Sequence, residues 1–123
     1  MSNDPHSLAT HPITVEPAQE RVVVRIGDTV VADTRAALIL EEADYPPAYY
    51  LPADDITADL LAQSDTTTYC PYKGDATYRS VRLDDGTVVQ DAAWVYEHPN
   101  VAVAEVLDHL SFYPGKVSIS VGD

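Results

Sequence analysis

Cysteine is almost missing from this sequence: Cys70 is the only one in 123 residues. A single cysteine excludes an internal disulfide, and it excludes zinc held by paired Cys-x-x-Cys knuckles. No His-x-x-x-His or His-Glu-x-x-His spacing offers another metal site. We therefore expect no structural metal. A lone free thiol also suits a reducing compartment, so the sequence predicts a cytoplasmic protein.

Glycine is scarce as well, and its five copies stand singly. A Gly-rich phosphate loop and the Gly-x-Ser-x-Gly elbow of a serine hydrolase are both absent, so the sequence predicts no nucleotide cofactor, nor any other. No apolar run approaches the roughly 18 residues that a membrane span requires. A membrane is therefore not an expected partner.

Basic residues are few, since seven Lys and Arg against twenty Asp and Glu give a net charge of −13. Such a field repels phosphate backbones, which excludes nucleic acid as an expected partner. The acids are mostly aspartate, and only Lys73 and Lys116 are lysines. This balance is typical of adaptation to a high-salt cytoplasm. Ordinary solubilising surface charge is the alternative.

The two interpretations of the charge make different predictions about salt. If the acidic excess is an adaptation, added salt screens the self-repulsion of the folded state. The melting temperature should then rise between low and about molar ionic strength. Thermal melts across that range measure it, and a melting temperature independent of salt supports the solubility alternative.

Turn residues between β-branched runs predict a mainly β fold. Gly27-Asp28 separates the runs 21–26 and 29–33, which is typical of a two-residue hairpin. Asp84-Asp85-Gly86 separates 78–83 from a run that begins at 87 and continues through Trp94 and Tyr96. Two further strands are expected at 37–41 and 117–121. The segment 45–52 should be irregular or lie at a sheet edge, because proline cannot donate to a ladder.

Two short helices complete the expected fold. Residues 54–63 carry apolar side chains on one side and an aspartate able to cap the first turn. Residues 101–110 follow Asn100, a second potential cap, and repeat apolar side chains at helical spacing. Residues 1–11 are polar and aperiodic and predict a flexible tail. Residues 12–123 are then one small domain.

The segment 68–74 is the strongest candidate site. It places the thiol of Cys70 three residues from the amine of Lys73, in a stretch fixed by Pro71 and Gly74. A cation and backbone N–H groups favour the thiolate, which is the nucleophilic form of cysteine. Lys73 could bind an anionic ligand, form an imine when desolvated, or pair with Asp75. The alternative for Cys70 is a small buried apolar side chain.

Residues 68–78 resemble the central motif of the domain of unknown function 427 family, with the sequence Thr-Tyr-Cys-Pro-Tyr-Lys-Gly-Asp-Ala-Thr-Tyr. Flanking blocks that resemble the same family are residues 33–38, 46–56, 92–99 and 111–114. The resemblance implies a mainly β domain of antiparallel sheets, similar to the β-tent architecture, with no established activity. The family's older nickname suggests a nucleotidyltransferase, but no residues here support one. Tyr72 stands where members often have tryptophan.

Tyrosine is abundant, and six of its eight copies lie between residues 45 and 78. Such side chains suit a ligand pocket, because each ring supplies contact area and each phenol a hydrogen bond. Covering sheet faces is the alternative use. The expected ligand-binding residues are Tyr50, Tyr72, Trp94, Tyr96, Arg35 and Glu41. Tyr50 resembles the family's paired-tyrosine position. Trp94 and Tyr96 share strand parity and should face the same side. Arg35 and Glu41 are expected either to hold a ligand carboxylate or to pair with each other.

Two functional classes remain open. The first is an enzyme or covalent carrier for a small organic substrate, with Cys70 and Lys73 as its catalytic residues. The second is a non-catalytic module that binds a small ligand or a peptide in a tyrosine-lined cleft. The position of Cys70 separates the two, because only a thiol beside Lys73 and Tyr50 in a pocket fits the first class.

Overall fold

The computed structural model describes residues 12–43 and 45–122, and strands make up most of this part of the chain. The predicted tail, residues 1–11, lies outside the described residues. The strands are β1 (Ile13–Pro17), β2 (Val22–Ile26), β3 (Thr29–Thr34), β4 (Leu38–Glu42), β5 (Ala48–Pro52), β6 (Leu61–Cys70), β7 (Gly74–Arg82), β8 (Val88–Tyr96), β9 (His109–Phe112) and β10 (Ser118–Val121). Three short 3-10 segments connect them: η1 (Ala53–Asp55), η2 (Ala58–Leu60) and η3 (Val101–Val106). None of the described helical segments is long and apolar enough to cross a membrane.

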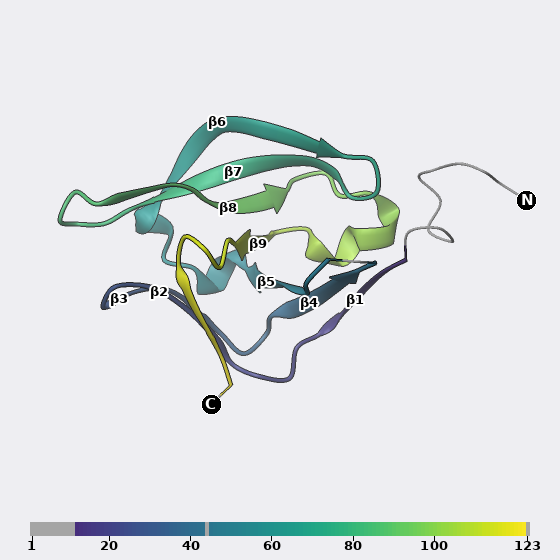
Figure 1. Ribbon diagram of the computed structural model, residues 1–123, viewed down its shortest axis with the longest axis horizontal. Coiled ribbons are helices and arrows are strands. Elements are labelled where there is room, and N and C mark those ends of the chain that lie inside the picture. The colour runs from purple at the N-terminus through teal and green to yellow at the C-terminus, as the bar shows by residue number, and fades with distance from the viewer. Residues whose placement is uncertain (1–11, 44, 123) are drawn as a thin grey trace, which may run out of the picture.

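The strands form two antiparallel sheets (Figure 1). The larger has seven strands in the order β1-β4-β5-β9-β8-β7-β6, and the smaller has the order β10-β2-β3. The larger sheet curves, so that β6, β7 and β8 lie above β4 and β1 in the view of Figure 1. The expected mainly β, antiparallel fold is therefore confirmed.

Both predicted hairpins are present. The chain turns from β2 to β3 at Gly27, whose φ of +58° is one that glycine adopts without strain. It turns from β7 to β8 around Gly86, with a φ of +91°. Asp85 Oδ1 accepts a hydrogen bond of 2.9 Å from the Thr87 N–H and stabilises this second turn. The predicted strands at 37–41 and 117–121 correspond to β4 and β10.

The helix predicted over 54–63 is wrong. The chain makes η1 and η2 and then enters β6 at Leu61. Between the two turns, Ile56 forms a bridge with Ala32, and the Thr57 N–H donates to the Val31 carbonyl at 2.8 Å. These contacts hold the segment extended against β3, so its N–H groups are not available for a helix.

The helix predicted over 101–110 is also wrong, because η3 ends at Val106 and β9 begins at His109. Val103 breaks the helical path with φ −128° and ψ 29°, and Asp108 turns the chain with φ +62°. β9 then pairs with both β5 and β8. Only an extended strand can form backbone hydrogen bonds with a neighbouring strand on each side. Strand β9 therefore stands where the second half of the helix was expected.

The segment 48–52 is neither irregular nor at an edge, since β5 lies between β4 and β9 inside the larger sheet. Its prolines explain the wrong prediction. Pro46 and Pro47 precede the strand and Pro52 is its last residue, so none removes a donor from the middle of the ladder. The edge strands of this sheet are β6 and β1, and the sequence pattern did not predict β1.

Two hydrophobic cores lie on opposite faces of the larger sheet. The first fills the space toward the smaller sheet and includes Val24, Leu51, Val81, Val95 and Phe112. The second includes Leu40, Tyr50, Tyr78, Tyr96, Val103 and Val106, with Trp94 and Tyr113 packed against it. Since side chains alternate along a strand, Trp94 and Tyr96 share this second face, as predicted.

Candidate functional site

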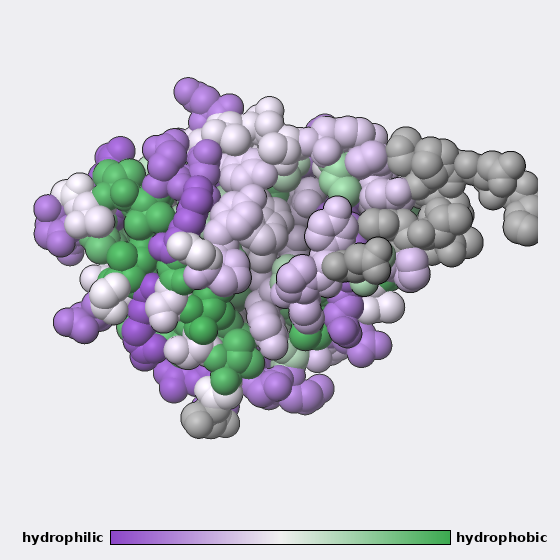
Figure 2. Space-filling model, in the orientation of Figure 1, coloured by the Kyte–Doolittle hydropathy of each residue, from purple (hydrophilic) through white to green (hydrophobic). Residues whose placement is uncertain are grey.

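A cavity of about 520 Å³ opens on the side of the second core. It is lined by Leu40, Glu42, Tyr45, Pro46, Pro47, Ala48, Tyr49, Tyr50, Cys70, Lys73, Trp94, Phe112, Tyr113, Pro114 and Ile119. The molecular face in Figure 2 is hollowed near its centre, where pale, weakly hydrophilic residues gather beside apolar ones. Most of the lining is aromatic or apolar, which is typical of a site for a small organic molecule.

The Cys-Pro-Tyr-Lys-Gly segment is the tight hairpin that joins β6 to β7. Within it, the Lys73 N–H donates to the Cys70 carbonyl at 3.2 Å. Asn100 fixes the hairpin from outside, because its backbone N–H donates to the Lys73 carbonyl and its side-chain amide donates to the Pro71 carbonyl. The sequence suggested a helix cap at Asn100, but its side chain makes no cap hydrogen bond. Its contacts instead present Cys70 and Lys73 to the cavity.

Gly74 closes this hairpin in a conformation that other residues avoid, with a φ of +115°. A Cβ atom here would lie 3.0 Å from the His98 carbonyl oxygen. We expect Gly74→Ala to lower the free energy of unfolding by about 2 kcal/mol. Urea denaturation measures the loss, with Gly115→Ala as control because a Cβ atom there meets nothing within 4 Å. Equal stabilities of the two variants would contradict a strained hairpin.

The charged part of the cavity is a salt bridge between the Lys73 ammonium and the Glu42 carboxylate. The two side chains are only 14% and 9% exposed. The Lys73 Nζ also lies 5.9 Å from the ring centroid of Tyr96, close enough for a cation–π contact. Of the three alternatives for Lys73, pairing with Asp75 is not seen, because Lys73 pairs with a residue of β4 instead.

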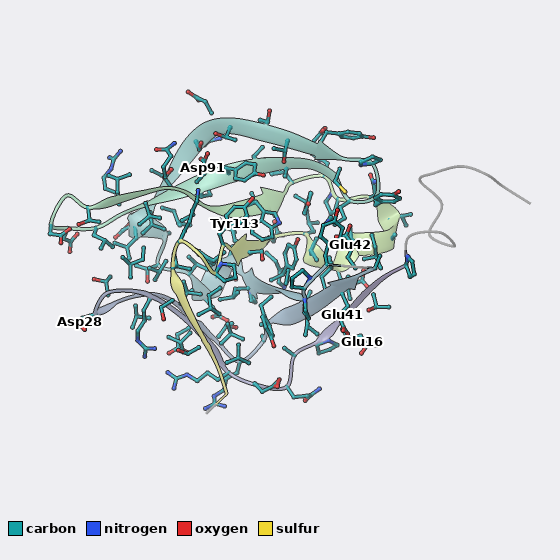
Figure 3. The ribbon with its side chains drawn as sticks, viewed as in Figure 1. Glu16, Asp28, Glu41, Glu42, Asp91 and Tyr113 are labelled. Atoms are coloured by element: carbon teal, nitrogen blue, oxygen red, sulfur yellow. The ribbon has the colours of Figure 1, made fainter. Side chains whose placement is uncertain are left out.

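Glu42 is a site residue that the sequence analysis missed in favour of its neighbour Glu41. The two lie on opposite sides of β4 in Figure 3. Glu41 is exposed on the side of Glu16, whereas Glu42 is buried. The apolar pattern of β4 carried a usable signal, because Glu42 shares strand parity with the buried Leu40.

The other predicted site residues divide into two groups. The cavity brings together Cys70, Lys73, Tyr50 and Trp94. Tyr96 lies behind this lining, 6.5 Å from Tyr50 between ring centroids. The lining does not include Tyr72, Arg35 or Glu41; Tyr72 is half-buried in the hairpin, and Arg35 is exposed between β3 and β4.

One wall of the cavity is a set of aromatic rings in contact. The Trp94 Nε1–H donates to the Tyr50 hydroxyl at 2.9 Å, and the two rings meet edge to face. On the other side of Trp94, the Tyr113 ring lies 4.5 Å away between centroids. Tyr113, labelled in Figure 3, belongs to a block that resembled the family but had no expected role. Such contacts fix the rings and pre-form the wall.

The phenols of Tyr50, Tyr96 and Tyr113 keep their protons at neutral pH. Burial raises the pKa of both Tyr50 and Tyr96 well above the ordinary phenol value. Burial, followed by the hydrogen bond with Tyr78, does the same for the pKa of Tyr113. These side chains can therefore donate or accept a hydrogen bond but cannot serve as bases.

Within the part of the lining that the structure describes there is no histidine, and the one amine is paired with a carboxylate. None of these described lining residues therefore supplies Cys70 with an ordered base of the kind that activates a nucleophilic thiol. No group of three His, Cys, Asp or Glu residues within 12–43 and 45–122 is arranged to hold a metal ion. The arrangement is suited to enclosing an apolar molecule and offering hydrogen bonds at one end.

These features define a mainly β protein of two antiparallel sheets with an aromatic cavity lined by residues of both hydrophobic cores. The chain belongs to the family described as a domain of unknown function (DUF427), whose family model matches residues 14–123. The resemblance carried by residues 68–78 and the flanking blocks is thereby confirmed. Comparison with the curated proteins gave no match.

Proposed function

We propose that the protein binds a small, largely apolar organic molecule in the cavity beside the Cys-Pro-Tyr-Lys-Gly hairpin. One observation carries the proposal: an aromatic cavity of about 520 Å³ that contains a single buried ion pair. Its volume lies within the range of small-molecule sites. The net charge of −13 disfavours nucleic acid and anionic membranes as partners. The free thiol of Cys70 suits a reducing cytoplasm, where we place this binding function.

The test uses Trp94, because it is the only tryptophan of the chain and lines the cavity. Its indole N–H gives one resonance in a ¹⁵N–¹H spectrum, which needs no assignment. We expect uncharged aromatic fragments at millimolar concentration to shift this resonance in wild type. Ala48→Phe fills the cavity and should abolish the shift, whereas Ala104→Phe adds the same ring on the exposed side of η3 and should preserve it. Fragments that leave the resonance unmoved, or move it equally in both variants, would refute the proposal.

A second candidate function is covalent capture of an electrophile, because Cys70 lines the cavity and is partly exposed. We expect iodoacetamide to label native Cys70 at neutral pH. Glu42→Gln leaves the Lys73 cation uncompensated and should speed labelling, since a nearby cation favours the thiolate. Lys73→Met leaves the Glu42 carboxylate instead and should slow it. We expect Glu42→Gln to be labelled about tenfold faster than Lys73→Met.

Intact mass against time measures these rates, with Lys116→Met as the control for loss of a lysine. Labelling of Cys70 only after unfolding would remove the covalent candidate and leave the binding function. Equal rates in Glu42→Gln and Lys73→Met would show that the ion pair does not act on the thiol.

A further inference from the structure

The charges of the described residues that line the cavity balance, in a strongly acidic protein. Among these residues only Glu42 and Lys73 carry charge, and they pair with each other. An anionic group entering the cavity would meet the Glu42 carboxylate as well as the Lys73 ammonium, against the background of a net charge of −13. Removing a carboxylate or phosphate from water is costly without an uncompensated cation to receive it.

The same pair leaves hydrogen-bond donors of Lys73, a lining residue, that no other described residue accepts. A lysine ammonium carries three N–H donors. Among the described residues, Glu42 is the only hydrogen-bond acceptor of the Lys73 Nζ. The Trp94 N–H is already used by Tyr50. The polar end of the cavity therefore offers N–H donors and is complementary to a ligand oxygen that accepts them.

We infer that the ligand is uncharged, with a flat apolar body and a carbonyl oxygen of the amide or ketone class that accepts a hydrogen bond from Lys73. This inference rests on the proposed binding function and narrows it to a ligand class. The apolar body contacts Trp94, Tyr50 and Tyr113, and the carbonyl meets the ion pair without bringing a charge of its own. Carboxylates and phosphates of the same shape are selected against, so the anionic ligand considered for Lys73 from sequence is replaced by a neutral one.

The experiment compares 2-naphthamide with 2-naphthoate, which share a ring system and differ in charge. Binding is followed by the Trp94 indole resonance. We expect the wild-type protein to bind the amide at least about tenfold more tightly than the carboxylate. Glu42→Gln keeps the side-chain shape but leaves Lys73 uncompensated, and it should reverse the preference. Glu41→Gln makes the same change of net charge on the opposite side of β4 and should keep the wild-type preference.

The outcomes separate the two proposals. Tighter or equal binding of 2-naphthoate in wild type overturns the ligand class and leaves the cavity a binding site. If other fragments shift the Trp94 resonance and neither naphthyl probe does, the ligand class is also wrong. If nothing shifts it, both proposals fall. Should Glu42→Gln not fold, the wild-type comparison is repeated with indole-3-acetamide and indole-3-acetate, and the same preference for the amide is required.

Discussion

Replacing Lys73 by methionine is expected to lower the free energy of unfolding by about 3 kcal/mol at neutral pH. Methionine keeps most of the apolar stem but removes the ammonium that pairs with Glu42. The Glu42 carboxylate is 9% exposed, so it would remain buried without the ammonium of Lys73.

Urea denaturation of a double-mutant cycle measures the effect. Glu42→Gln alone should also destabilise, because it leaves a buried ammonium, while Glu42→Gln combined with Lys73→Met should recover most of the loss. Lys116→Met is the matched control, since the exposed Lys116 donates to the Gln90 and Asp91 carbonyls and lies over the Tyr113 ring, so the contacts that it loses are with uncharged groups. If Lys73→Met costs no more than Lys116→Met, the pair is effectively solvated and the charge argument for the ligand class loses its basis.

Local patterns in the sequence were sufficient to predict the hairpins, because a two-residue turn and the strand residues beside it lie within about ten residues of each other. The position of a strand in the sheet was not predictable in the same way. β5 looked like an edge from its prolines, yet β9 pairs beside it from more than fifty residues away. The two expected helices failed for a related reason. The apolar residues of these segments are buried as their spacing predicted, and Val103 and Val106 are examples. The backbone, however, forms hydrogen bonds with distant strands instead of within a helix.

The residues of the candidate site differ in the same way, because some are neighbours in sequence and others come together only in the fold. Cys70 and Lys73 stand within one hairpin, so the sequence placed them together. Glu42 is 31 residues from Lys73 along the chain, and only the curvature of the larger sheet brings β4 to the hairpin. Glu41 was predicted in place of Glu42 because the two are adjacent in one strand, where neighbouring side chains point to opposite faces of the sheet.

We expect the fold to lose stability steeply above pH 10. Tyr50 and Tyr96 are only 1% and 5% exposed, and burial raises the pKa of each well above the ordinary value near 10. The folded state therefore keeps both protons while the unfolded chain releases them. This contribution to stability is fully present below pH 10 and falls as the pH rises, by about 1.4 kcal/mol per pH unit for each tyrosine. The two together should cost roughly 3 kcal/mol by pH 11.

Urea denaturation between pH 9 and pH 11 measures this slope, and tyrosinate absorbance shows when the phenols ionise. In the folded protein the two buried phenols should ionise only as the chain unfolds. Tyr50→Phe removes one of the contributions from tyrosines of raised pKa, so its stability should decline less steeply with pH than that of wild type, even though it loses the hydrogen bond from Trp94 at every pH. Tyr45→Phe makes the same chemical change at a residue that is 65% exposed, and it should keep the wild-type slope. A Tyr50→Phe slope equal to that of wild type would mean that the Tyr50 phenol ionises within the folded state, and the wall of the cavity would then be open to water.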